Sequence, residues 1–218
     1  VSGAGNAFNY TDTNAVTVGS VDGINGISTN NGSISITASS GAMTILDTAA
    51  AIDVNAGTNS VTYTADNMTL TGTTSAGFIA TLTPSMSGQL INLGGADAAG
   101  TLGITSAELD TVTAGTLRIG NASSGNISIT TAIAPSGTST LSLITSGTVS
   151  QSLTITETNL RISSTGSVSL TLSNDVTLLA ANVSGSGNAF SYVDVNVLSI
   201  GSVDGVDGIT TNGGAIEI

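Results

Sequence analysis

The sequence lacks histidine, cysteine and tryptophan, and it contains only two basic residues. Charged residues make up 7% of its 218 positions, against about 25% in an ordinary soluble domain. The absence of cysteine excludes disulfides, thiolate metal sites and thiol catalysis. With a formal net charge of −12, the chain also lacks the cations with which proteins bind nucleic-acid phosphates or anionic lipid. We therefore expect no nucleic-acid partner.

Long hydrophobic runs are missing as well. Ser, Thr, Asn or Gly interrupts the apolar stretches every few positions, so none reaches the ~18 residues of a membrane helix, and we expect no membrane insertion. Disordered chains are poor in β-branched residues, whereas Val, Ile and Thr abound here. An ordered all-β protein remains. The segment that begins at Val1 has no basic or contiguous apolar stretch of a signal peptide, so we expect any export signal upstream, in a longer chain.

The two ends of the chain repeat each other. Residues 1–36 and 183–218 align without gaps, and 22 of the 36 positions are identical. Residue 183 thus corresponds to residue 1, an offset of 182 positions. Duplication explains such similarity and chance convergence does not. We expect residues 1–182 to form one super-repeat, residues 183–218 to begin the next copy of a continuous solenoid, and further copies to lie on both sides.

A finer pattern runs through the super-repeat. Six short runs alternate apolar and polar residues, which is the period of a half-buried strand: residues 33–36, 61–64, 90–93, 126–129, 153–155 and 168–172. Between them lie segments rich in Gly, Asn and Ser, which tolerate the left-handed backbone of tight corners: residues 30–32, 56–59, 123–126 and 164–166. Short strands with short corners predict a sandwich, an antiparallel barrel or a β-solenoid.

Aromatic content favours the solenoid. Only 3% of the residues are aromatic, whereas a sandwich or barrel core of this size normally fills with Phe, Tyr and Trp. The duplication points the same way, because each coil of a solenoid contacts only its neighbours and copies add without rebuilding a core. With strands ~4.8 Å apart, one super-repeat predicts a rod segment of roughly 35–45 Å.

One segment departs from the strand pattern. Thr105 is followed three residues later by Glu108, a capping-box spacing that begins a helix. We expect one short helical insertion near residues 105–112, closed by Ala114 and Gly115.

Several stretches resemble repeats of giant bacterial proteins of the filamentous haemagglutinin-like type. They are residues 93–104, 108–120, 201–205 and 211–214. The resemblance covers most of the chain and lies in texture as much as in motif, and autotransporter passengers share it. It implies a right-handed parallel β-helix, secretion across the outer membrane, and roles in adhesion or surface coating. It carries over no catalytic residues.

Two glycine-rich segments suggest calcium loops. Asp22 lies in one, and Asp204 and Asp207 lie in the other. A calcium site needs several converging oxygen ligands, and Asn25 stands at the position of Asp207 in the first copy. We therefore expect corner turns at both places, with calcium as the alternative and no other metal or cofactor.

The charged residues offer weak candidates for chemistry. Arg118 and Arg161 lie in strand-like runs and could clamp a sugar acid, as arginines of β-helix lyases do. We expect instead an arginine that faces outward and pairs with Glu108, Asp110 or Glu157. Acid/base chemistry needs paired carboxylates in a pocket.

The candidate carboxylate pairs are Asp47 with Asp53 and Glu108 with Asp110, which are neighbours only in sequence. Because the chain has no histidine, cysteine or lysine, most nucleophile–base arrangements are unavailable. We expect no enzyme and no catalytic residues.

The expected function is therefore structural and adhesive. We expect an extracellular rod of a bacterial surface or secreted filament protein, with cell-surface or matrix glycans or proteins as partners and lateral self-association into fibres. The alternatives are a polysaccharide-active β-helix enzyme, which predicts Asp, Glu and Arg gathered in one groove, and a carbohydrate- or ice-binding module, which predicts a flat face with regular ranks of Thr or Asn.

Overall fold

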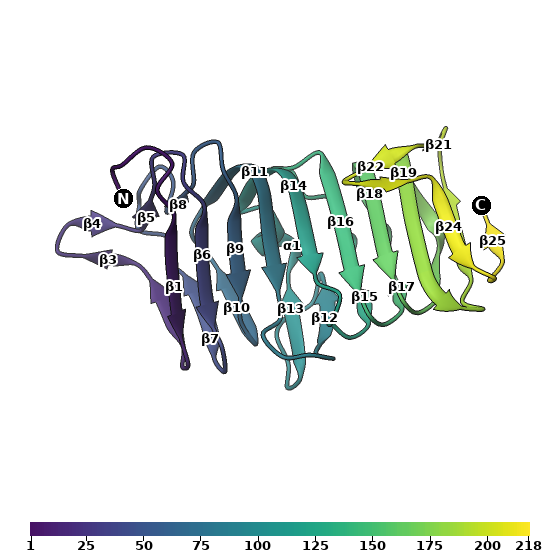
Figure 1. Ribbon diagram of the computed structural model, residues 1–218, viewed down its shortest axis with the longest axis horizontal. Helices are drawn as coiled ribbons and strands as arrows, with labels where there is room; N and C mark the ends of the chain where they lie inside the picture. Colours follow the sequence, from purple (N-terminus) through teal and green to yellow (C-terminus); the bar gives the residue numbers. More distant parts are fainter.

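The computed structural model describes residues 1–218 as an elongated, almost entirely β molecule with its termini at opposite ends (Figure 1). Eighteen strands join in one sheet, and its neighbouring strands run parallel. The arrangement is consistent with a parallel β-helix-like fold. No helix is long and apolar enough to cross a membrane.

One parallel ladder runs along most of the molecule. Its strands, in the order in which they pair, are β1 (Phe8–Asp12), β6 (Ile34–Ala38), β9 (Val61–Thr64), β11 (Thr74–Thr83), β14 (Val112–Gly120), β16 (Thr140–Thr145), β18 (Thr156–Ser164) and β19 (Val168–Ser186). At the C-terminal end, β19 pairs with β21 (Ser199–Ile200) and β24 (Ile209–Asn212).

Shorter ladders complete the structure. The first consists of β13 (Thr101–Ile104), β12 (Leu90–Leu93), β15 (Ile127–Ile129), β17 (Val149–Gln151), β19, β20 (Phe190–Asp194) and β25 (Ile216–Glu217). The second consists of β2 (Val16–Val18), β7 (Ala42–Ile45) and β10 (Asn67–Leu70). Strands β5 (Ile27–Ser28) and β8 (Val54–Asn55) pair with each other, and β8 also pairs with β11.

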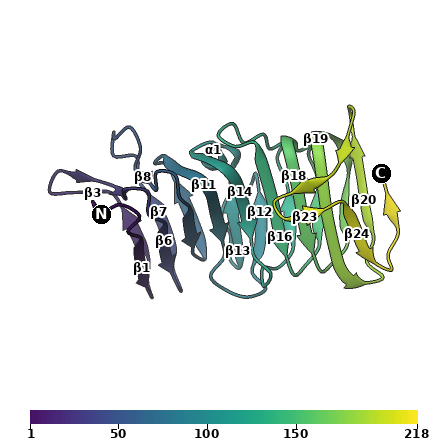
Figure 2. The ribbon, with the colours of Figure 1, turned by 45° about the horizontal axis from the view of Figure 1, so that its top comes forward.

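Two antiparallel hairpins project from these ladders. They are β3 (Ser20–Val21) with β4 (Ile24–Asn25) and β22 (Ser202–Val203) with β23 (Val206–Asp207). Hairpin β3–β4 extends beyond the N-terminal end of the molecule. Hairpin β22–β23, near the C-terminal end, folds back over the preceding strands (Figures 1 and 2).

The interior is mainly aliphatic and continuous along the stack. Residues in register on successive strands are all buried: Ile34, Val61, Ala80, Leu117, Leu141, Leu160 and Leu179. They belong to one cluster of 43 buried residues. Because every strand places the same side-chain type over its neighbour, burying the next coil is favourable wherever one coil has formed.

Most local predictions are confirmed. Five of the six alternating runs overlap strands. Asn31 and Gly57, in two of the expected corners, have positive φ angles of 60° and 58°. The short helix is confirmed as α1 (Ser106–Leu109), with both hydrogen bonds of the Thr105–Glu108 capping box present.

Two local predictions are wrong. The helix closes at Asp110, and Ala114 and Gly115 lie inside β14, because the chain pairs with β11 from Val112 onward. Residues 153–155 do not form a strand; Ile155 makes an isolated bridge with Ile133. There, the buried side chain of Asn174 accepts the hydrogen bond of the Ile155 amide at 2.9 Å and so replaces a neighbouring strand as its partner.

Candidate functional site

The two suspected calcium segments form hairpin turns. Asp22 and Gly23 connect β3 to β4 with φ angles of 50° and 78°, and Asp204 and Gly205 connect β22 to β23 with φ angles of 47° and 80°. Two successive positive φ angles are typical of the type I′ turn, in which Asp-Gly is a favoured pair. The segments are therefore tight turns, as expected, but turns of projecting hairpins and not of coil corners.

The calcium candidates do not converge. Asp22 lies on the N-terminal hairpin, Asp204 at the tip of the C-terminal hairpin and Asp207 in β23. No group of three or more carboxylates in the structure is arranged to hold a metal ion. The carboxylate of Asp204 is already occupied by an arginine.

Arg118 and Asp204 form a two-pronged ion pair. The Arg118 Nε donates to Asp204 Oδ2 at 2.8 Å and Nη2 donates to Oδ1 at 2.6 Å, which is the strongest geometry for a guanidinium and a carboxylate. Ser142 lies beside Arg118 on the next strand, and Arg161 lies beside Ser142 on the one after. Arg161 Nη1 donates to Ser142 Oγ at 3.1 Å. The ladder thus brings both basic residues of the chain to one place.

The prediction that an arginine pairs with Glu108, Asp110 or Glu157 is wrong. Each of these carboxylates accepts hydrogen bonds from other groups. Glu108 accepts from Thr105 and from the amide of Leu70; the other two accept from Ser136 (Asp110) and from Thr138 and Thr158 (Glu157). Asp204 lies 86 residues from Arg118 in sequence, beyond the start of the second copy, so local spacing gave no sign of it.

The ion pair is electrostatically complementary. Burial by itself would raise the pKa of Asp204, but the hydrogen bonds of Arg118 and Ser142 and the charges of two guanidinium groups outweigh it, so this pKa lies below its usual value. The hydrogen bond to Asp204 raises the pKa of Arg118. Burial lowers the pKa of Arg161. Asp204 is therefore held ionised between two cations.

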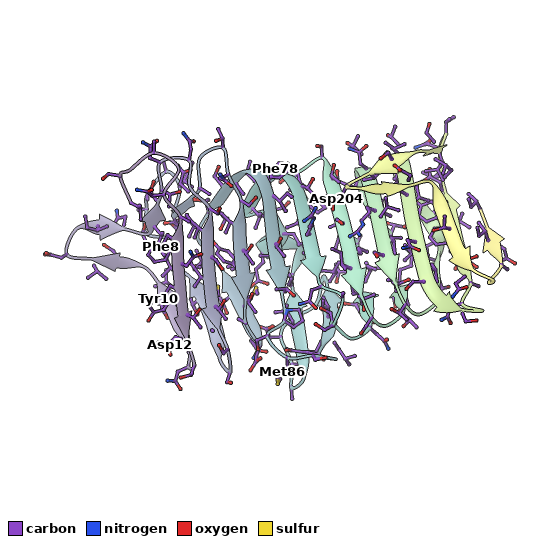
Figure 3. All side chains as sticks on the ribbon, in the orientation of Figure 1. Phe8, Tyr10, Asp12, Phe78, Met86 and Asp204 are labelled. Carbon is purple, nitrogen blue, oxygen red and sulfur yellow. The ribbon has the colours of Figure 1, made fainter.

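Hairpin β22–β23 covers the strands beneath it. It lies across β18 and β19, and Asp204 at its tip reaches Arg118 of β14 (Figures 2 and 3). Ser142 and Ala180 occupy the same outward rank as the arginines, yet both are 0% exposed. We call this hairpin together with Arg118, Ser142, Arg161 and Ala180 the clasp. Its small members leave space for the hairpin, and Arg118 binds the tip.

A second group of charges lies between β10 and β13. A groove of about 600 Å³ there is lined by Asp97 and Glu108 among others. Asp97 Oδ2 accepts from the amide of Met68 at 3.1 Å and Oδ1 from that of Gly103 at 2.8 Å, while Glu108 Oε1 accepts from the amide of Leu70 at 3.1 Å. The two carboxylates thus stand where a paired strand would present carbonyl oxygens to β10.

No pattern in the sequence predicted this role of Asp97. Burial, and to a lesser extent the charge of Glu108, raises the pKa of Asp97, although its backbone hydrogen bonds oppose the shift. In a chain with 14 acidic residues, an acid within a glycine-rich loop was the one available signal. All four carboxylate oxygens of Asp97 and Glu108 accept hydrogen bonds from the chain itself. The pair therefore has a structural role, because it links β10 to β13 and to the start of α1.

Asp47 and Asp53, which are close in sequence, do not form a carboxylate pair. Asp53 is 1% exposed; its Oδ1 accepts from the amide and hydroxyl of Thr48, and its Oδ2 from those of Thr73. Burial alone would raise the pKa of Asp53, but these hydrogen bonds together lower it. Asp47 accepts from the amide of Ala49. The two carboxylates therefore accept hydrogen bonds from different groups and do not act as a pair.

The clasp makes a measurable prediction. We expect Arg118→Ala and Asp204→Ala each to lower the free energy of unfolding by about 2 kcal/mol, and the double variant to lose less than the sum, with a coupling of about 1–2 kcal/mol. Since the pKa of Asp204 lies below its unfolded value of about 3.9, the coupling should be complete above that pH and vanish as the pH falls through the folded pKa. Urea unfolding of the four proteins between pH 2 and pH 7 measures it, and additive losses at pH 7 would contradict it.

Comparisons with protein-family models, curated proteins and solved structures find no match for this chain.

Proposed function

We propose that this chain is a segment of a right-handed β-solenoid that serves as a stiff extracellular rod in a very large bacterial surface or secreted filament protein. The rod holds binding regions at a distance from the cell. Its faces, which are covered with hydroxyl and amide groups, contact cell-surface or matrix glycans or proteins. The role is mechanical, because hydrogen-bonded ladders along the axis resist bending and local unfolding.

One observation carries the proposal: the ladders pass without interruption through the beginning of the second copy. Ala181 pairs with Ile209, Val168 pairs with Phe190, and Phe190 pairs with Ile216. A ladder that enters the next copy in register can be lengthened by any number of copies, since each coil needs only its neighbours. From β1 to β19, both in the first copy, the ladder advances seven steps. The counterpart of β1 in the second copy is β20, which follows β19, so at ~4.8 Å a step the super-repeat is roughly 34–38 Å long.

Two further observations support a structural role over catalysis. The carboxylates that line the groove beside β10, Asp97 and Glu108, accept hydrogen bonds from the chain's own amides, and both arginines belong to the clasp. The outward rank beside the clasp continues as Asn9, Ser35, Thr62 and Thr81, an uncharged set of hydrogen-bonding groups. Weak contacts from such ranks, repeated along many copies, add up to avidity.

Immunogold electron microscopy of the bacterium that makes this protein tests the proposal. Antibodies against the chain should label thin fibres outside the cell, and averaged fibre images should show an axial repeat of roughly 34–38 Å. Label confined to the cell interior, or compact particles without an axial repeat, would refute it. A second antibody against a cytoplasmic protein, which should label only sectioned cells, controls for access.

A further inference from the structure

Two hairpins with nearly the same sequence have opposite surroundings. Residues 20–23 and 202–205 both read Ser-Val-Asp-Gly, and both turns have the same pair of positive φ angles. Hairpin β22–β23 lies in the clasp, while hairpin β3–β4 projects from the N-terminal end without covering any strand (Figure 1). The same local sequence therefore folds in the same way whether or not it is docked.

Burial shows what docking changes. Val203 is 4% exposed, whereas its counterpart Val21 is 74% exposed, and Ile24 is exposed as well. Asp204 is held by Arg118, whereas Asp22 has no ion pair in the structure. On hairpin β3–β4, the side chains of Val21, Ile24 and Asp22 are therefore exposed to solvent. In the second copy of this hairpin the valine is buried and the aspartate is paired with an arginine.

The surface behind this hairpin differs in the same way. Phe190 and Tyr192 in the second copy are 0% and 1% exposed, because β20 lies against β19. Their counterparts on β1 are Phe8, which is partly exposed, and Tyr10, which is 45% exposed. These two side chains lie on β1 at the N-terminal end (Figure 3), and they border a hollow of about 300 Å³ lined mainly by apolar residues.

We propose that hairpin β3–β4 and the β1 end of this chain form a docking surface for another copy of the super-repeat, with Asp22 bound by that copy's counterpart of Arg118 and close to the charge of its counterpart of Arg161. The occupant is defined by the second copy of the hairpin, which is seated on β14, β16, β18 and β19 of the first. Ser142 and Ala180 provide the space for the hairpin, and the arginines provide the charge for its tip. Each copy thus reaches back and fastens the copy before it.

This inference rests on the proposed stacking of super-repeats, but not on location or adhesion. It concerns which residues seal one copy against the next. The present chain contains one such seal, around Asp204, and that seal serves as the internal standard for the test.

The test uses a lengthened chain in which residues 1–182 precede the full sequence. The join is natural, because residues 183–185 and 1–3 are both Val-Ser-Gly. The protein has no cysteine, so Val21→Cys in the second unit introduces a single thiol, and the rate of its reaction with an uncharged thiol reagent reports exposure. In the 218-residue chain, V21C should react at least tenfold faster than V203C. In the lengthened chain, V21C should slow at least tenfold, to near the V203C rate.

A further variant of the lengthened chain identifies the binding groups. Arg118→Ala in the leading unit should accelerate V21C labelling again, several-fold, while Arg118→Ala in the second unit should not. A V21C rate equal to that of the 218-residue chain, with V203C still protected, would overturn the docking proposal and leave the stacked rod intact. Rapid labelling of V203C in both proteins would overturn the stacking itself, and the docking proposal with it.

The two hairpins can also be exchanged within the present chain. Val206→Ile together with Asp207→Asn gives the second hairpin the sequence of the first. The proposal requires the exchanged hairpin to dock, so V203C should remain protected to within about threefold. Loss of protection would mean that the hairpin of the first copy does not fit the clasp, and would contradict the proposal.

Discussion

Replacement of Asp53 by alanine is expected to lower the free energy of unfolding by about 4 kcal/mol, a larger loss than either single substitution in the clasp should cause. The carboxylate is buried and accepts four hydrogen bonds, at 2.9 Å and 2.6 Å from Thr48 and at 2.8 Å and 3.1 Å from Thr73. The substitution removes all four hydrogen bonds, and hydrogen bonds to a charged group contribute about 1.5–3 kcal/mol each. The backbone of Asp53 also accepts from the amide of Ile27 and donates to Thr73, so the damage lies where three coils meet.

Asp47→Ala is the matched control. Asp47 belongs to the same corner but is exposed, and its carboxylate accepts from the Ala49 amide at 2.9 Å; its loss should cost less than about 1 kcal/mol. Urea unfolding compares the two. Because the pKa of Asp53 is lowered in the folded protein, its stabilisation should be complete above its unfolded value of about 3.9 and disappear as the pH falls through the folded pKa. Equal losses for D53A and D47A at pH 7 would show that the network contributes nothing.

Local signals explain why much of the fold was predictable. Alternation marked the strand at Val61–Thr64, and the Thr105–Glu108 spacing marked α1. Each signal acts within a few residues, where backbone geometry decides the outcome. The mainly aliphatic interior followed from composition, because a chain with so few aromatic residues has mostly aliphatic side chains to bury.

The site was not predictable, because the coils differ in length. Register links Ile34 to Val61, Val61 to Ala80, and Ala80 to Leu117, which are separations of 27, 19 and 37 residues. A side chain on one coil therefore meets a partner at no fixed distance in sequence. For the same reason Asp204 was not identified as the partner of Arg118.

Replacement of Glu108 by alanine is expected to lower the free energy of unfolding by about 3 kcal/mol. Its Oε2 accepts from the amide and hydroxyl of Thr105 at 2.9 Å and 2.8 Å, and its Oε1 accepts from the amide of Leu70 at 3.1 Å. The first two belong to the cap of α1, and loss of a cap costs about 0.5–2 kcal/mol. The third satisfies the free edge of β10, and an orphaned buried amide costs about 1–3 kcal/mol.

Hydrogen exchange separates these two contributions. In E108A, the amides of Leu70 and Thr105 should exchange at least tenfold faster than in the parent, because their acceptor is gone, while the Met68 amide remains bound to Asp97. Asp110→Ala is the control: it removes an exposed carboxylate two residues away that holds Ser136, so the Leu70 amide should keep its protection. If the Leu70 amide exchanged equally slowly in both variants, Glu108 would not be the acceptor that protects the edge of β10, and another acceptor would have to be.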